Sequence, residues 1–291
     1  MAIFSGIISR LRGSVENLTF VRVGGKTVVR KKVERKATPS RSRRQMKHRV
    51  VFCNLVNVYR AFTGKLHPSF ENKAEGRSDY NEFMSANLGS NGVALKASDA
   101  RQGGCVVAGY QVTRGSLPSV VVSFGEGQVP VTDIDLGGMT IGASTTLATF
   151  SQAVVENNDG WMQGDQLTVF VAHQLLDSIT GVPRVTIVGK ELTLDVADDS
   201  TLLGDVLDAN FLAAVDGKLA MGGPVNGAVA VVHSRLTKSG TRVSTQFFVV
   251  NNPMLSQYQT DEAFEAAMAS YGLAGGDDFL TPNVDEPSAE A

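Results

Sequence analysis

The sequence predicts an α+β protein that is mostly β, with a basic N-terminal hairpin and helices followed by a β-rich, sandwich-like region. The 3.6-residue apolar spacing of a long helix occurs only in the first ninety residues. After Val93 the chain consists mainly of short Val- and Thr-rich runs separated by Gly, Pro and Ser. The 291 residues are 43% hydrophobic and 19% charged, which is typical of a folded chain that buries a core. We expect a basic arm over residues 1–90, β-rich structure over 91–272 and an acidic, disordered segment over 273–291.

The arm is predicted to open with a hairpin over residues 15–33. Its two strands, 15–23 and 26–33, are separated by Gly24-Gly25, which supplies the positive φ angles of a type I′ turn. A long helix follows, with Thr38 as its N-cap, Pro39 at its first position and Gly64 as its stop. A shorter helix is predicted from Asp79 to Asn87, because Asp79 and Glu82 have capping-box spacing.

The β-rich region is predicted from its β-branched runs and the turn residues between them. Its strands are expected over residues 105–112, 119–124, 129–136, 166–174, 184–188 and 191–196, with a helix over 144–157. The stretch 202–214 fits either a helix or a loop. A second hairpin is predicted from 227–235 and 242–250, and a short helix capped by Asp261 over 261–271.

The charge of the chain is strongly segregated. Residues 1–50 hold 14 of the 27 Lys and Arg residues and only Glu16 and Glu34 among acids, a net charge of +12, whereas the other 241 residues carry −14. Twelve net charges in fifty residues repel one another unless something compensates them. A solvated charged face is the alternative interpretation, and the charges on the second hairpin strand also suit an exposed sheet edge.

The basic residues of this arm are the candidate partner-binding or nucleic-acid-binding site. Cations at a helix N-terminus oppose the helix macrodipole, so local stability does not explain them. We expect an acidic partner: copies of the chain itself, other particle proteins or nucleic acid. The candidates are Lys26, Arg30, Lys31, Lys32, Arg35, Lys36, Arg41, Arg43, Arg44, Lys47 and Arg49.

The sequence contains no recognised catalytic motif, so we expect no enzyme, no cofactor and no metal. Phosphate-loop, dinucleotide, zinc-protease and serine-hydrolase patterns are all missing. His173 and His233 are expected to be structural, Cys53 to be a buried inert thiol and Cys105 to be more exposed. Asp133 and Asp135 alternate on a predicted strand, which is weak support for a metal without a third ligand. Trp161 is expected to pack over the end of the sheet.

Localisation follows from similar arguments. The sequence has no apolar run near the roughly 20 residues that span a bilayer, and Arg10 and Arg12 interrupt any signal-like core. Two cysteines do not support a disulfide framework. We therefore expect a soluble protein with no membrane contact.

The segment 275–291 is acidic and lacks apolar periodicity. Gly275-Gly276 forms a flexible joint, and Pro282 and Pro287 prevent regular structure. Such a segment cannot offset its ordering entropy alone. If it becomes ordered, we expect it to bind a basic surface such as the arm of another copy, with Phe279 and Leu280 as apolar contacts.

Several short stretches form a pattern that is shared with other proteins: 13–20, 25–26, 29–32, 38–39, Gln45, 80–83 with Asn87, 113–118, 164–167 and 243–245. Together they resemble an uncharacterised family, a domain of unknown function, of Bacteroidetes and their phages. The chain departs from the pattern at Val21 and in its longer C-terminal part. The resemblance implies a non-enzymatic, β-rich protein encoded by a phage or an integrated element, and we expect it in the virion or the host cytoplasm.

Two functional hypotheses outrank an enzyme. The first is a structural or assembly protein, in particular a phage virion component, whose basic arm contacts an acidic partner. The second is a nucleic-acid-binding protein without sequence specificity, whose residues 26–49 neutralise phosphates. Against sequence-specific recognition, the chain carries no known DNA-reading module and the arm has few aromatics for stacking.

Overall fold

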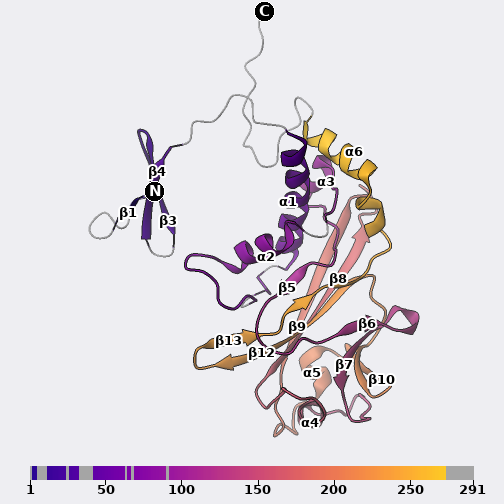
Figure 1. Ribbon diagram of the computed structural model, residues 1–291. Coiled ribbons are helices and arrows are strands. Elements are labelled where there is room, and N and C mark those ends of the chain that lie inside the picture. The colour runs from indigo at the N-terminus through magenta and orange to yellow at the C-terminus, as the bar shows by residue number, and fades with distance from the viewer. Residues whose placement is uncertain are drawn as a thin grey trace, which may run out of the picture.

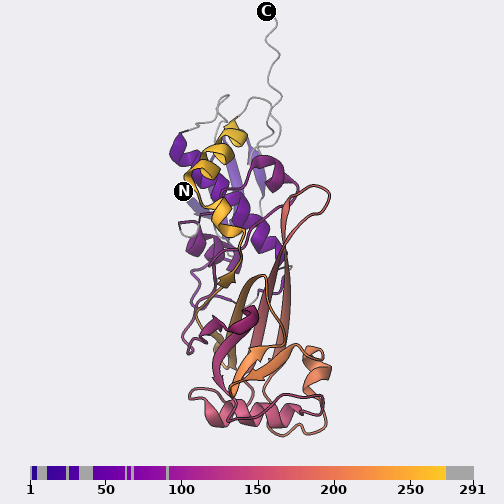
Figure 2. The ribbon, with the colours of Figure 1, turned by 90° about the vertical axis from the view of Figure 1, so that its right-hand side faces the viewer.

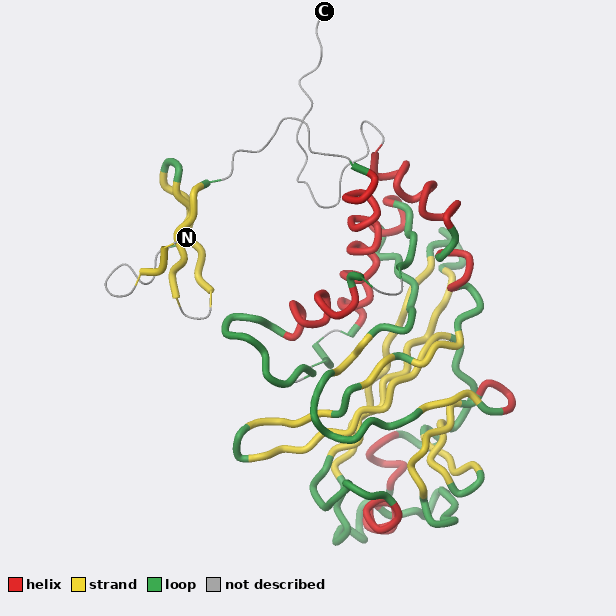
Figure 3. The backbone as a smooth tube through the Cα atoms, viewed as in Figure 1, coloured by secondary structure: helices red, strands yellow, loops and turns green. Residues whose placement is uncertain are grey.

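The computed structural model describes residues 2–4, 12–23, 26–32, 42–62, 64–66, 69–89 and 92–272. It is an α+β fold with a β-rich region, which confirms the predicted fold class (Figure 1). Figure 3 shows most of the helices gathered at one end of the molecule, strands in its middle and further helices at the far end. The acidic segment predicted over 273–291 lies outside the described residues.

The N-terminal residues form a small antiparallel sheet in the order β1-β4-β3-β2. The predicted hairpin is confirmed, since Val23 of β3 pairs with Lys26 of β4; the Gly24-Gly25 turn lies outside the described residues. The single strand expected over 15–23 is interrupted, because Glu16 adopts a positive φ of 48° and reverses the chain. The strands are β1 (Ala2–Phe4), β2 (Gly13–Val15), β3 (Leu18–Val23) and β4 (Lys26–Lys31).

Four helices form one layer of the main body: α1 (Arg43–Ala61), α2 (Asp79–Asn87), α3 (Ala97–Arg101) and α6 (Asp261–Gly272). Ser42 caps α1 by accepting a hydrogen bond from the Gln45 amide at 3.4 Å. The predicted start of this helix, with Thr38 as its N-cap and Pro39 at its first position, is therefore wrong by four residues; Thr38 and Pro39 themselves lie outside the described residues. Gly64 has the positive φ, 76°, of a residue that ends a helix, as predicted.

The predicted caps of α2 and α6 are wrong by one residue. The Ser78 hydroxyl accepts from the Asn81 amide at 3.3 Å, and the Thr260 hydroxyl accepts from the Ala263 amide at 3.1 Å. Asp79 instead points inward, where its Oδ1 accepts from the amides of Ser69 and Phe70. A neutral hydroxyl therefore caps the helix while the adjacent carboxylate fixes the preceding loop.

The central sheet is antiparallel in the order β13-β12-β8-β9, with β15 also paired to β12. The two strands predicted over 184–188 and 191–196 are one strand, because Gly189 continues the ladder opposite Phe170. A Cβ at Gly189 would lie 3.1 Å from Cε1 of Phe170, so the glycine makes room for that ring. The strands are β8 (Gln166–Leu176), β9 (Pro183–Thr193), β12 (Gly227–Thr237), β13 (Gly240–Val243) and β15 (Val249–Asn251).

A second antiparallel sheet has the order β10-β11-β7-β6 and lies with α4 at the end of the molecule far from α6 (Figure 2). The helix predicted over 144–157 is confirmed from Leu147, and the ambiguous stretch 202–214 holds a short helix and a strand. The elements are β6 (Val122–Phe124), η1 (Glu126–Gln128), β7 (Pro130–Asp135), α4 (Leu147–Asn157), α5 (Leu203–Leu207), β10 (Leu212–Val215) and β11 (Lys218–Met221).

The strand predicted over 105–112 is mostly wrong. Only β5 (Gln111–Thr113) forms, paired with β14 (Gln246–Phe247), and η2 (Leu255–Tyr258) lies before α6. The irregular residues before β5 are buried, and side-chain amides satisfy their backbone: Asn54 of α1 accepts from Val106 N and donates to Val106 O. Side chains from other elements thus replace a strand partner here.

The central sheet is buried on both faces. On one face, Phe170 and Ala172 of β8 pack against α1, α2, α3 and α6. On the other face, Val169 and Val171 pack against the second sheet and α4. Because side chains alternate along a strand, one sheet supplies two cores.

Phe62 at the end of α1 joins the helical layer to the central sheet. Its ring is 1% exposed and lies 5.5 Å from Phe170, 5.8 Å from Phe248 and 6.2 Å from Phe83, centroid to centroid. We expect Phe62→Ala to lower the free energy of unfolding by about 3–5 kcal/mol, because the cavity removes contacts on both layers. Denaturant titration measures this change.

Phe247→Ala is the matched control, because the Phe247 side chain is 52% exposed. We expect that variant to change the free energy of unfolding by at most about 0.5 kcal/mol. Equal effects from the two substitutions would contradict the placement of Phe62 between the layers.

Candidate acidic-partner surface at the start of α1

The first turns of α1 present cations on their outer side. Arg43, Arg44, Lys47 and His48 are exposed, whereas Met46 and Val50 are buried in the core. Residues three and four apart share a face of a helix, so Arg44, Lys47 and His48 lie together above Val51. The sequence therefore folds the basic run into an amphipathic helix whose charged side is left in solvent.

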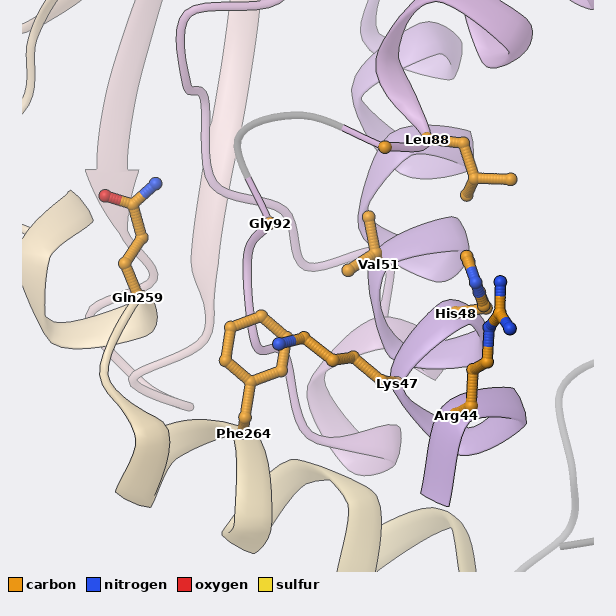
Figure 4. Close-up of a pocket in the computed structure, with 9 residues that line it drawn as sticks. Arg44, Lys47, His48, Val51, Leu88, Gly92, Gln259 and Phe264 are labelled. Atoms are coloured by element: carbon orange, nitrogen blue, oxygen red, sulfur yellow. The ribbon is translucent and has the colours of Figure 1, made fainter. Parts of the chain in front are cut away.

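The side chains of Arg44, Lys47 and His48 line a pocket of about 420 Å³ between α1, the connection from α2 to α3, and the start of α6 (Figure 4). Leu88, Val51 and Phe264 supply its apolar side. Gly92 lets the α2–α3 connection approach, since a Cβ there would lie 3.0 Å from Cζ of Phe264. The lining residues are Arg44, Lys47, His48, Val51, Leu88, Gly89, Gly92, Gln259 and Phe264.

The pocket carries an excess of positive charge. The Lys47 ammonium lies 4.7 Å from the centroid of the Phe264 ring, a cation–π contact that holds it beside the pocket. Arg43 forms an ion pair with Glu265 of α6. Among the described residues, neither Arg44 nor Lys47 has a carboxylate partner. The first turn of α1 holds no acidic residue, so the positive end of the helix dipole adds to this field.

The other predicted site residues do not join this pocket. Lys26 pairs with Glu75 at 2.9 Å, and Arg49 is half-buried with its guanidinium 3.8 Å from Sδ of Met46. Arg30, Lys31 and Lys32 are exposed at and just beyond the end of β4. Arg35, Lys36 and Arg41 lie outside the described residues.

Sequence reasoning missed part of the pocket. His48 was visible as a neighbour of Arg44 at helical spacing, and that spacing was a usable signal. The apolar wall was not predictable, because Leu88, Gln259 and Phe264 come from segments far apart in the sequence.

A second cluster of polar side chains is buried between the β8 and β12 strands. Asp165 is 0% exposed; its carboxylate accepts two hydrogen bonds from Arg235, at 2.6 and 2.7 Å, and one from the Met162 amide at 2.9 Å. Nε2 of His233 lies 2.8 Å from the same carboxylate. These contacts lower the pKa of Asp165 even though its burial opposes ionisation.

Trp161 covers this cluster, since its ring stacks on that of His233 with centroids 3.8 Å apart. Trp161 is 8% exposed, which confirms its predicted packing role. Nδ1 of His233 is buried with no hydrogen-bond partner. Burial lowers the pKa of His233 although Asp165 favours its protonation, because Arg235 already compensates that carboxylate. His233 is therefore a neutral structural side chain whose Nε2–H donates to Asp165.

The remaining chemical candidates are structural. Cys105 is buried, not more exposed as predicted, and burial raises the pKa of its thiol to about 11. Asp133 and Asp135 accept from backbone amides of Val121 and Gly137. Over the described part of the chain, no group of three or more His, Cys, Asp or Glu side chains is placed to hold a metal ion. No helix there is long and apolar enough to cross a membrane.

The His233 contacts predict a pH dependence of stability. The pKa of His233 is lower in the folded protein than its ordinary value of 6.5, so the unfolded chain binds more protons below that pH. We expect the free energy of unfolding to fall as the pH drops from about 6.5 towards 5, by up to about 1.4 kcal/mol per pH unit. Asp165 contributes only at lower pH, because its pKa is lowered from 3.8.

Denaturant titrations between pH 5 and 7 measure this slope. His233→Gln is expected to reduce it, and His48→Gln, which removes an exposed histidine, is expected to leave it unchanged. A slope that persists in the His233 variant would contradict this assignment.

Comparisons of the chain with protein-family models, with curated proteins and with solved structures gave no match.

Proposed function

We propose that the chain is a non-enzymatic structural or assembly protein, a component of a phage particle, and that it contacts an acidic protein partner through the pocket at the start of α1. The family resemblance supports the phage origin. The segregation of +12 in residues 1–50 from −14 in the remainder supports contacts between oppositely charged surfaces of neighbouring copies.

The observation that carries the proposal is the mixed chemistry of the pocket. Arg44 and Lys47 stand at a cavity whose other walls include Val51, Leu88 and Phe264. A protein segment with acidic and apolar side chains satisfies both halves of such a site, and interfaces generally place an apolar anchor within a polar rim. A phosphate backbone satisfies only the cations.

Nucleic-acid binding is the second candidate. The exposed Arg30, Lys31 and Lys32 add a further group of cations at the end of β4, which would suit phosphates along a strand of nucleic acid. The two functions differ in their salt dependence. Neutralising Z phosphates of duplex DNA gives a slope of about −0.9Z in a plot of log K against log salt.

We expect Arg44→Gln with Lys47→Gln to weaken self-association of the full chain at least tenfold, because both side chains face the pocket and are exposed. The melting temperature should stay unchanged, since neither side chain is buried. Sedimentation equilibrium measures the association, and fluorescence anisotropy with a random DNA duplex at 50 and 200 mM salt measures the alternative.

Lys238→Gln with Arg242→Gln is the control, because it removes two exposed cations from the β12–β13 hairpin. The proposal predicts normal association for that variant. If the pocket variant associates normally while duplex binding falls steeply with salt and depends on Arg44 and Lys47, the nucleic-acid function replaces the assembly function.

A further inference from the structure

We propose that the pocket at the start of α1 binds residues 277–280 of a second copy of this chain. The inference rests on the proposed assembly function and adds the identity of the acidic partner. It follows from the chemistry of the pocket, the sequence of the segment and the charges on α6.

The pocket places cationic side chains beside an apolar wall. Lys47 and Phe264 are held together by their cation–π contact. Arg44 lies one helical turn before His48 and two turns before Val51, on the same side of α1. Figure 4 shows the Lys47 side chain extending from α1 to the Phe264 ring of α6, while the Arg44 and His48 side chains lie next to each other, away from that ring. A ligand for this site needs carboxylates next to a bulky apolar group.

Residues 277–280 have this composition. Asp277 and Asp278 are followed directly by Phe279 and Leu280, and no other point in the chain places two consecutive carboxylates next to two large apolar residues. We assign the carboxylates to Arg44 and Lys47 and the Phe279 side chain to the apolar wall formed by Val51, Leu88 and Phe264.

The source of the segment is a second copy and not the same chain. Phe264 precedes the end of α6 by eight residues, about 12 Å of helix, which five extended residues after Gly272 would span. Chain length thus permits a fold-back. That path, however, returns an acidic segment along the exposed side of α6, where Asp261, Glu262 and Glu265 would repel it.

A segment of a second copy does not have to follow α6 and can reach the pocket from the side of α1 that carries Arg44, Lys47 and His48. The contact is heterologous, because the pocket and the segment are different surfaces of the chain. Such contacts generate closed rings or open filaments, both of which suit an assembly protein.

The experiment uses charge reversal in the full chain. The pocket variant carries Arg44→Glu and Lys47→Glu, and the segment variant carries Asp277→Lys and Asp278→Lys. We expect each variant alone to self-associate at least tenfold more weakly than the original chain, as measured by sedimentation velocity. A segment control, Asp285→Lys with Glu286→Lys, makes the same charge change a few residues further on and should associate normally.

Mixing the two variants in equal amounts provides the decisive measurement. Each pocket then meets a segment of opposite charge on the other chain, so association should return. Circular dichroism and melting temperatures confirm that all variants are folded.

Other results overturn the inference. If the mixture remains monomeric while the chain carrying all four substitutions becomes more compact, the segment binds its own pocket. If the pocket variant loses association but the segment variant does not, a different acidic partner occupies the pocket and the proposed function stands alone. If neither variant changes association, both proposals fail.

Discussion

The fold depends on a central sheet that has no solvent-facing side along its middle strands. All eight residues from Gly227 to Ser234 of β12 are buried, and alternate side chains enter different cores. A sheet buried on both faces requires a covering layer on each side. The helical layer of α1, α2, α3 and α6 and the layer of the second sheet with α4 are therefore consequences of one strand arrangement. Phe62 and Phe170 illustrate the coupling, because each ring belongs to a different layer and they meet edge to face.

The sequence predicted the elements well where the determining signal is local. The hairpin of β3 and β4, the helices α1, α2, α4 and α6, and the turn that pairs β12 with β13 all follow from turn residues or periodicity within a short window. The strand predicted over 242–250 is wrong beyond Val243, because β14 pairs with β5 and β15 pairs with the start of β12. It failed where distant residues decide. Gly189 suggests a break between two strands in the sequence. In the structure it lies within one strand, β9, where the ring of Phe170 on the neighbouring strand leaves room only for a glycine. The run before β5 looks like a strand, yet the Asn54 amide takes the place of a strand partner.

The candidate site was also predictable only where its residues are close together in the sequence. Its cations lie within one helix, so composition and helical spacing were enough to include Arg44 and Lys47 among the eleven basic candidates, although not to single them out. Its apolar wall required knowing that α6 packs on α1 and that the α2–α3 connection passes beside them. The Asp165 cluster was equally hidden, because Asp165 and His233 are neighbours only through the pairing of β8 with β12. A histidine and an aspartate that are remote in sequence carry no signal of a shared hydrogen bond.

Core packing also explains why the basic side chains of the pocket remain exposed to solvent. Met46 and Val50 of α1 belong to the core shared with the sheet, which fixes the rotation of the helix about its axis. With that rotation fixed, Arg44, Lys47 and His48 must face outward whether or not a partner is present. Helix polarity makes the arrangement locally unfavourable, since cations lie where the dipole is positive. α6 compensates part of the cost through the Arg43–Glu265 pair and the contact of Lys47 with Phe264. Arg44 has no carboxylate partner among the described residues, so the element that completes the helical layer also shapes the cationic surface on which we propose that an acidic segment docks.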